Sequence, residues 1–92
     1  MEFKRDEYTL TVPDRPTVRQ QLEYFSAGIG LPLALRHWEG AKTLIQSWKC
    51  DKLPDHTTNL DSITDPTVTT IIIQAGADVM RYMSGLEELP KN

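Results

Sequence analysis

The chain has 92 residues, of which 39% are apolar and 25% are charged, and its net charge is −3 at pH 7. This length fits one domain, and the composition excludes a disordered chain. The acidic balance argues against sequence-independent binding of nucleic acid, which needs a basic surface. A domain this small often gains stability from a partner or from self-association.

The first predicted element is a β-strand over residues 7–12. Apolar residues alternate with threonine from Tyr8 to Val12, and Pro13 ends the run. A period of two with such residues is typical of a strand with one buried face. A lone short strand would leave backbone groups unpaired. We therefore expect a hairpin with a strand around Phe3, or pairing with another chain.

A short helix is predicted over residues 17–27. Thr17 and Gln20 have the spacing of a capping box, and Gly28 is a typical residue at a helix end. The apolar positions that follow the cap recur every three or four residues: Val18, Leu22, Phe25 and Ile29. This period indicates one apolar face.

A longer helix is predicted over residues 33–49. Its apolar stripe is formed by Ala34, Trp38, Ala41, Ile45 and Trp48. This spacing places both tryptophans on the same face, about 15 Å apart at the usual helical rise. We expect Trp38 in the core and Trp48 near an edge, where it would anchor a partner. Gly40 and Ala41 predict a shallow dent in which another backbone comes close.

Residues 50–65 are predicted to form an acidic loop. Turn-forming residues are frequent there, and four aspartates lie in it: Asp51, Asp55, Asp61 and Asp65. Residues 33–50 are more basic. Charge runs of this kind usually mark solvated faces. The alternative is a charge-complementary contact between neighbouring copies.

The last predicted helix runs over residues 66–89. Asp65 fits its N-cap, Pro66 its first position, and Pro90 its end. One apolar stripe follows the helix: Val68, Ile72, Ala75, Val79, Tyr82 and Leu86, widened by Ile71 and Met83. The predicted fold class is thus mostly α in a single domain, 1–92. It has a short N-terminal β-strand or hairpin followed by three helices, the middle and last helices long and packed together.

The sequence predicts no enzyme, no cofactor and no metal. His37, Cys50 and His56 match no zinc-ligand spacing. Cys50 is the one cysteine, so no internal disulfide forms, and it lies at a predicted helix C-terminus, where the dipole disfavours a thiolate. Residues Glu87 and Glu88 diverge on a helix and do not form a catalytic pair.

We also expect a soluble cytoplasmic protein without a signal peptide. The first residues are charged and are not followed by an apolar run. No stretch approaches the roughly 20 apolar residues that cross a membrane as a helix.

Three segments resemble the tail assembly chaperones of long-tailed bacteriophages: YTLTVPDRPTVRQQLEY, LRHWEGAKTLIQSWKCDKLPD and TDPTVTTIIIQAGADVMRYMSGLEELPKN. The resemblance covers most of the chain. Patterned tryptophans, a leucine–proline break and a lysine–asparagine end carry it, and none of these is a catalytic signature.

The resemblance implies a small helical protein that binds the tape measure protein, a very long helical chain with exposed apolar stripes. It would keep that chain soluble in the cytoplasm of the infected bacterial host until tail tube subunits displace it, and it would be absent from the mature virion. An apolar stripe on a small module can take an amphipathic helix as a helix-in-groove contact.

The family supplies no fixed binding residues, so we predict them from the stripes alone. The predicted protein-binding residues are Trp48, Gly40, Ile71, Tyr82 and Met83. The apolar stripes also exceed what three short helices can hide, so we expect a homo-oligomer at micromolar or higher concentration.

A second product is expected from the resemblance. In the family, ribosomes often slip back one base near the end of the short product and continue into a longer one that recruits tail tube protein. The final residues LPKN are compatible with a slippery A-AAA-AAC or A-AAA-AAT run, if Lys91 is encoded by AAA. Tail tube protein is therefore an expected partner of a frameshifted longer form.

Two other functions remain open from the sequence. One is a small acidic helical interaction protein of another kind, either antitoxin-like or a host-directed phage inhibitor. The other is an accessory subunit of an enzyme complex. Gene neighbourhood distinguishes a tail assembly chaperone from both, because a chaperone gene should lie between a tail tube gene and a very long tape measure gene.

Overall fold

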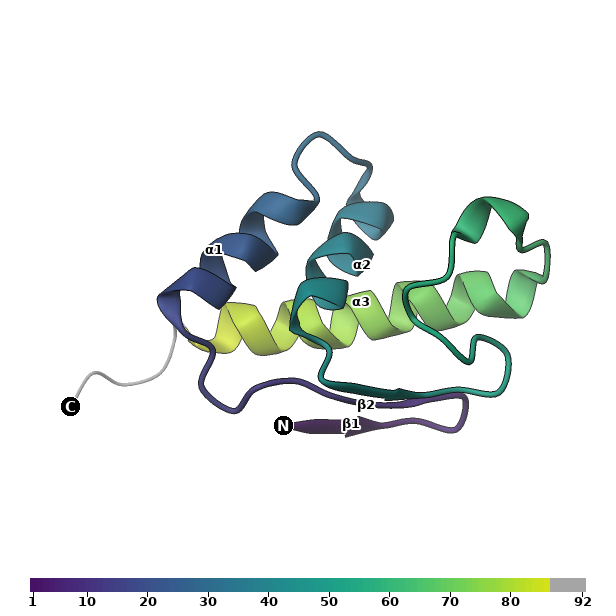
Figure 1. Ribbon diagram of the computed structural model, residues 1–92, viewed down its shortest axis with the longest axis horizontal. Coiled ribbons are helices and arrows are strands. Elements are labelled where there is room, and N and C mark those ends of the chain that lie inside the picture. Colours follow the sequence, from purple (N-terminus) through teal and green to yellow (C-terminus); the bar gives the residue numbers. More distant parts are fainter. Residues whose placement is uncertain (87–92) are drawn as a thin grey trace.

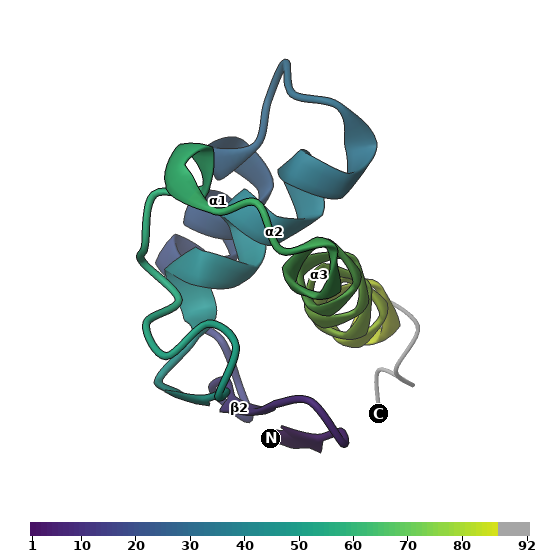
Figure 2. The same ribbon diagram turned by 90° about the vertical axis from the view of Figure 1, so that its right-hand side faces the viewer.

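In a computed structural model that describes residues 1–86, helices cover one side of a small sheet (Figure 1). Viewed along α3, the helices α1 and α2 lie to one side of it and the sheet lies below (Figure 2). The elements of residues 1–86, in chain order, are β1 (Glu2–Lys4), β2 (Thr9–Thr11), α1 (Val18–Ala27), α2 (Leu33–Leu44), β3 (Ser47–Lys49), the 3-10 turn η1 (Leu60–Ser62) and α3 (Pro66–Leu86).

The sheet is antiparallel, with β2 between β1 and β3. Leu10 of β2 lies opposite Phe3 on one side and Trp48 on the other. The turn that joins β1 to β2 is closed by the backbone N–H of Arg5, which donates to the Tyr8 carbonyl at 2.8 Å. The hairpin expected around Phe3 is confirmed, and the alternation from Tyr8 to Val12 places Tyr8, Leu10 and Val12 in the core.

The prediction of one helix over residues 33–49 is wrong. α2 ends at Leu44, Ile45 has extended backbone angles, and residues 47–49 form β3. The backbone N–H of Gln46 donates to the Thr11 carbonyl at 2.8 Å, so this segment completes the sheet along β2. Pairing with β2 overrides a helical period that the same residues also satisfy. The fold is therefore mixed α/β rather than mostly α, and α2, with 12 residues, is little longer than α1, with 10.

α3 begins at Pro66 as predicted. The Asp65 carboxylate accepts a hydrogen bond from the backbone N–H of Thr67 at 2.9 Å and so caps the helix. The helix is described to Leu86, and the predicted continuation over 87–89 lies outside the described residues. Most of its predicted stripe is buried: Val68, Ile71, Ile72, Ala75, Val79 and Met83.

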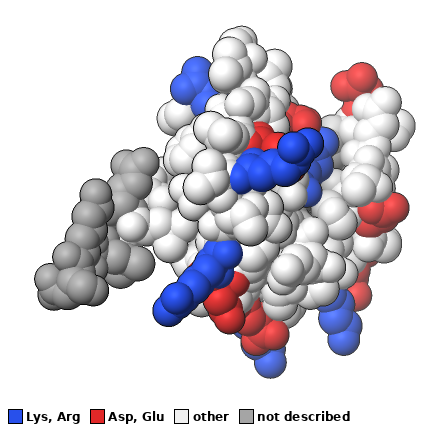
Figure 3. Space-filling model, turned by 60° about the vertical axis from the view of Figure 1, so that its left-hand side comes forward, with Lys and Arg blue, Asp and Glu red and all other residues white. Residues whose placement is uncertain are grey.

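Charged side chains lie over the surface in small mixed groups (Figure 3). Several are paired with near neighbours in the chain: Arg19 with Glu23 at 3.1 Å, and Lys42 with Glu39 at 2.9 Å.

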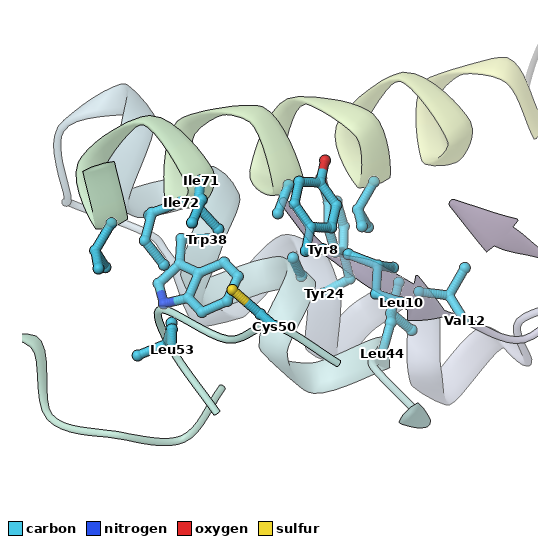
Figure 4. Packing of buried hydrophobic residues seen from close by; sticks show 14 of the residues in the cluster. Tyr8, Leu10, Val12, Tyr24, Trp38, Leu44, Cys50, Leu53, Ile71 and Ile72 are labelled. Atoms are coloured by element: carbon cyan, nitrogen blue, oxygen red, sulfur yellow. The ribbon is translucent and has the colours of Figure 1, made fainter. Parts of the chain in front are cut away.

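Trp38 is the largest fully buried side chain of the core and lies between α3 and the loop after β3 (Figure 4). α2 comes close to α3 at Gly76, where a Cβ atom would lie 3.1 Å from the Trp38 backbone nitrogen. It comes equally close to α1 at Gly40, where a Cβ atom would lie 2.9 Å from the Tyr24 ring. The dent predicted at Gly40 is therefore filled by α1.

Candidate functional site

An apolar groove of about 250 Å³ opens at the surface where the first turns of α2 and α3 meet the segment around η1. We call it the α2–α3 groove. It is lined by Ala34, Leu35, Leu60, Ile63, Asp65, Val68, Thr69, Ile72 and Ile73.

The walls of the groove come from three separate segments. Val68 and Ile72 belong to the buried stripe of α3. Ile73 lies one position beyond that stripe and is 51% exposed, and Leu35 of α2 is 42% exposed. The side chain of Asn59 caps η1 by accepting from the backbone N–H of Asp61 at 2.9 Å, which holds the third wall in place. The groove thus exposes aliphatic side chains beside the buried stripe of α3.

One carboxylate belongs to this apolar lining. The backbone N–H of Thr67 donates to Asp65 and holds the pKa of that carboxyl below its ordinary value, so Asp65 is ionised at neutral pH. The Lys52 ammonium lies 4.0 Å from it and offsets part of the charge. The groove is therefore suited to an apolar side chain with a cationic or polar neighbour.

A second apolar surface lies on the outer side of α1. We call Val18, Leu22, Phe25 and Ile29 the α1 row; their exposure ranges from 51% to 75%. Within Val18–Ala27 only Tyr24 is buried. The predicted apolar face of this helix thus points to solvent, because Tyr24 fits against Gly40 and fixes the opposite side of α1 to α2.

The two tryptophans pack against each other instead of lying about 15 Å apart on one helix. Their ring centroids are 5.5 Å apart in an edge-to-face arrangement. Trp48 also stacks on Tyr8 at 5.6 Å, and its indole N–H donates to the Leu53 carbonyl at 2.6 Å. Because β3 turns Trp48 toward the sheet and the loop, this half-buried side chain stabilises the fold and does not stand free as an anchor.

The other predicted binding residues do not form an accessible surface either. Gly40, Ile71 and Met83 are buried in this structure and so present no exposed side chain to a partner. Tyr82 is half-buried, and its hydroxyl lies within hydrogen-bond distance of two backbone carbonyl oxygens, those of Pro13 at 2.9 Å and Asp14 at 2.5 Å. The physical reason is that Ile71, Tyr82 and Met83 lie on the side of α3 that packs into the core, and that Gly40 lies against Tyr24 of α1.

Sequence reasoning did not identify the buried carboxylate of Asp78, on the inner side of α3. It accepts hydrogen bonds from Arg5 at 2.6 and 3.0 Å, from the Tyr8 hydroxyl at 2.5 Å and from Arg81 at 2.8 Å. Burial raises the pKa of Asp78, but these donors outweigh burial and the net pKa is lowered. The available signal was an aspartate next to Val79 on an otherwise apolar stripe.

The Asp78 cluster ties the β1–β2 hairpin to α3. Its carboxylate is occupied by four hydrogen bonds from three residues, so it is a structural anchor and not a free general base. Over residues 1–86, no group of three or more metal-ligating side chains comes together. Nor does any helix in this part of the chain have the length and apolar character to cross a membrane.

Comparison with protein families, with curated proteins and with solved structures finds no match to this chain.

Proposed function

We propose that this protein is a binding module that holds the apolar stripe of a helical partner in the α2–α3 groove, and that it serves as a tail assembly chaperone for the tape measure protein. The observation that supports the proposal is the groove itself. It is an open, aliphatic depression with one carboxylate, Asp65, in its lining.

The size of the groove favours side chains of a protein over a cofactor. Sites for small molecules usually measure about 300–1,000 Å³ and enclose most of the ligand, whereas this groove has about 250 Å³ and is open to solvent. Apolar residues of an amphipathic helix at positions i, i+3 and i+4 would enter such a groove from one side. Each aliphatic side chain that is buried fully contributes about 1.5–3 kcal/mol.

A contact of this size is weak, and weakness suits a chaperone. Two or three buried side chains contribute about 3–9 kcal/mol, and association itself costs about 4 kcal/mol or more, so one such contact has an affinity on the order of millimolar. Many weak contacts along one long partner give avidity and are displaced one at a time. Growing tail tube would then remove the chaperone without a separate release step.

The remaining parts of the proposal follow from the resemblance to tail assembly chaperones. The protein would act in the cytoplasm of the infected host and be absent from the mature virion. A frameshifted longer form would bring tail tube protein to the same tape measure chain. In the rival function, a small acidic interaction protein of another kind, the groove would serve a different helical partner.

The test measures binding of helical fragments of the tape measure protein by isothermal titration. A designed amphipathic peptide with leucines at i, i+3, i+4 and i+7 and flanking lysines serves as the reference ligand. Ile73→Asp places a charge on the exposed rim and should weaken binding at least tenfold, which corresponds to about 1.4 kcal/mol. The matched control is Thr70→Asp, which adds the same charge to an exposed position of α3 outside the groove.

The possible outcomes test the binding site and the chaperone role separately. If Ile73→Asp and Thr70→Asp bind the reference peptide equally well, the α2–α3 groove is not the binding site. Binding of the reference peptide without binding of any tape measure fragment would keep the groove and overturn the chaperone role. Loss of tape measure solubility on co-expression with the Ile73→Asp variant, but not with Thr70→Asp, is the result we expect.

A further inference from the structure

The α1 row has no cover within residues 1–86, and we infer that a second copy of this chain covers it through an antiparallel α1–α1 contact. A surface helix normally turns its apolar stripe toward the core. In α1 the buried side holds Tyr24 alone, while the four row residues are between 51% and 75% exposed. An apolar surface of this kind on a small domain marks an interaction site.

The spacing of the row fits another helix of the same kind. Val18, Leu22 and Phe25 follow each other by four and three residues, and Ile29 comes four residues later, just beyond the helix end. Alternating steps of three and four form the seam of a two-helix contact. A two-fold axis placed between Leu22 and Phe25 sets Leu22 of each copy against Phe25 of the other. The same axis brings Val18 toward Ile29 of the second copy, so one patch is complementary to itself.

The charges of α1 permit this contact although the whole chain is acidic. Arg19 and Glu23 are the charged residues of the helix, and the Arg19 Nε lies 3.1 Å from a Glu23 carboxylate oxygen. The helix is thus neutral, and two copies do not repel each other along it. A strongly acidic or basic partner would find no complementary charge there. This charge balance favours a second copy over a charged partner.

The exposed area is sufficient for a weak dimer. At about 60–120 Å² for each fully exposed apolar side chain, the four residues of the α1 row, each 51% to 75% exposed, present about 150–300 Å² of apolar surface. A standard interface buries about 800 Å² on each partner, of which a little over half is apolar. The row therefore supplies a large share of the apolar area of a standard interface, and we expect dissociation constants in the micromolar range.

Dimerisation through α1 leaves the α2–α3 groove free. The groove lies at the first turns of α2 and α3 and includes no residue of Val18–Ala27, and Figure 1 places α1 at the other end of the molecule from η1. Two grooves on one dimer would bind a repetitive helical partner with avidity. This consequence rests on the proposed function, but the dimer itself does not.

Sedimentation equilibrium of the purified chain without any partner tests the inference. We expect a monomer–dimer equilibrium for the wild-type chain and for Ile73→Asp, which adds a charge to an apolar residue outside the row that is 51% exposed, against 62% for Leu22. Leu22→Asp should weaken the dimer by about 100-fold or more, the loss expected at a central interface residue. Its melting temperature, measured below the dissociation constant, should match that of Ile73→Asp because Leu22 is 62% exposed.

A monomer at all concentrations, or equal weakening by both variants, would overturn the inference. Orientation is tested by cross-linking under mild oxidation, since Cys50 is buried. A mixture of the Leu22→Cys and Phe25→Cys chains should form a mixed disulfide faster than either chain alone forms a homodimer. Faster self-cross-linking of Leu22→Cys would overturn the antiparallel arrangement.

Discussion

The contact between the two tryptophans predicts that substitutions at Trp38 and Trp48 are not additive. Trp38 is fully buried, and Trp48 meets it edge to face at 5.5 Å. Leucine at either position keeps part of the apolar volume, so each single substitution should cost less than the roughly 3–5 kcal/mol of a Trp→Ala change. Aromatic pairs contribute about 0.5–1.5 kcal/mol beyond the burial of area. The double variant should therefore be more stable, by about that amount, than the sum of the two single losses predicts.

The two single substitutions should also differ in kind. The indole N–H of Trp48 donates to the Leu53 carbonyl, so Trp48→Leu removes a hydrogen bond worth about 0.5–1.5 kcal/mol as well as the stack on Tyr8. The buried indole N–H of Trp38 has no acceptor within the described part of the chain. Trp38→Leu therefore removes an unpaired donor, and that relief offsets part of the cost of the lost volume.

Urea unfolding followed by far-UV circular dichroism measures all four free energies, because tryptophan fluorescence is lost in the double variant. A domain of this length has about 5–14 kcal/mol of stability, and the comparison requires that the double variant keep part of it at low urea. Residues about 15 Å apart on one continuous helix would instead be additive within about 0.3–0.5 kcal/mol. Additivity at that level would refute the packing of β3 against the core.

Two further predictions concern α1 and the buried carboxylate. Gly40→Ala should destabilise the domain, because its Cβ would lie 2.9 Å from the Tyr24 ring and 3.0 Å from the Tyr24 carbonyl oxygen. At Gly85 no heavy atom lies within 4 Å of an added Cβ, so Gly85→Ala should instead stabilise the domain by about 0.5–1 kcal/mol. Thermal melting of the two variants measures the difference. Stabilisation by both substitutions would contradict the close contact between α1 and α2. The lowered pKa of Asp78 means that its stabilising effect is full above the unfolded pKa of about 3.9 and is lost as pH falls through the lower folded pKa. Urea midpoints should therefore fall below about pH 4 in the wild-type chain, and part of that fall should be absent in Asp78→Asn; an identical pH profile in the two would contradict the role of the cluster.

Local signals allowed several elements to be predicted from the sequence. Thr17 and Gln20 form the predicted capping box, with hydrogen bonds of 2.8 and 3.1 Å between them. Asp65 and Pro66 begin α3 as expected. In each case the residues that decide the structure lie within one turn of each other, so the chain around them carries the whole signal.

The end of α2 could not be found in this way, because residues 45–49 fit two structures. Ile45 and Trp48 continue a helical stripe, yet in a strand Trp48 lies opposite Leu10. The choice is made by β2, more than thirty residues earlier in the chain. The helical interpretation therefore placed Trp48 on a helix instead of in β3, and Ile71, Tyr82 and Met83 were chosen from a stripe of α3 that the core already uses.

The α2–α3 groove could not be predicted for a related reason, since its walls come from α2, η1 and α3. Ile73 was the one local sign, as an apolar residue on the polar side of a helical stripe. Val18, Leu22 and Phe25 were recognised as one face, but their direction depends on how Tyr24 fits against Gly40. A stripe establishes that a helix has an apolar face and does not determine what covers that face.

The stability of α1 should depend on whether a partner covers the α1 row. One buried side chain, Tyr24, holds the helix on its inner side, while the α1 row offers more apolar surface outward. A helix of 10 residues is marginal on its own in water, so α1 should open more readily than α3 does. Any partner that covers the row binds only the ordered helix and therefore stabilises it by mass action. For this reason hydrogen exchange of the α1 amides should slow as protein concentration rises through the dimerisation range, whereas the same amides in Leu22→Asp should exchange at a rate independent of concentration. If exchange of the α1 amides in the wild-type chain does not depend on protein concentration, self-association does not stabilise α1, and the α1 row does not have the role proposed for it.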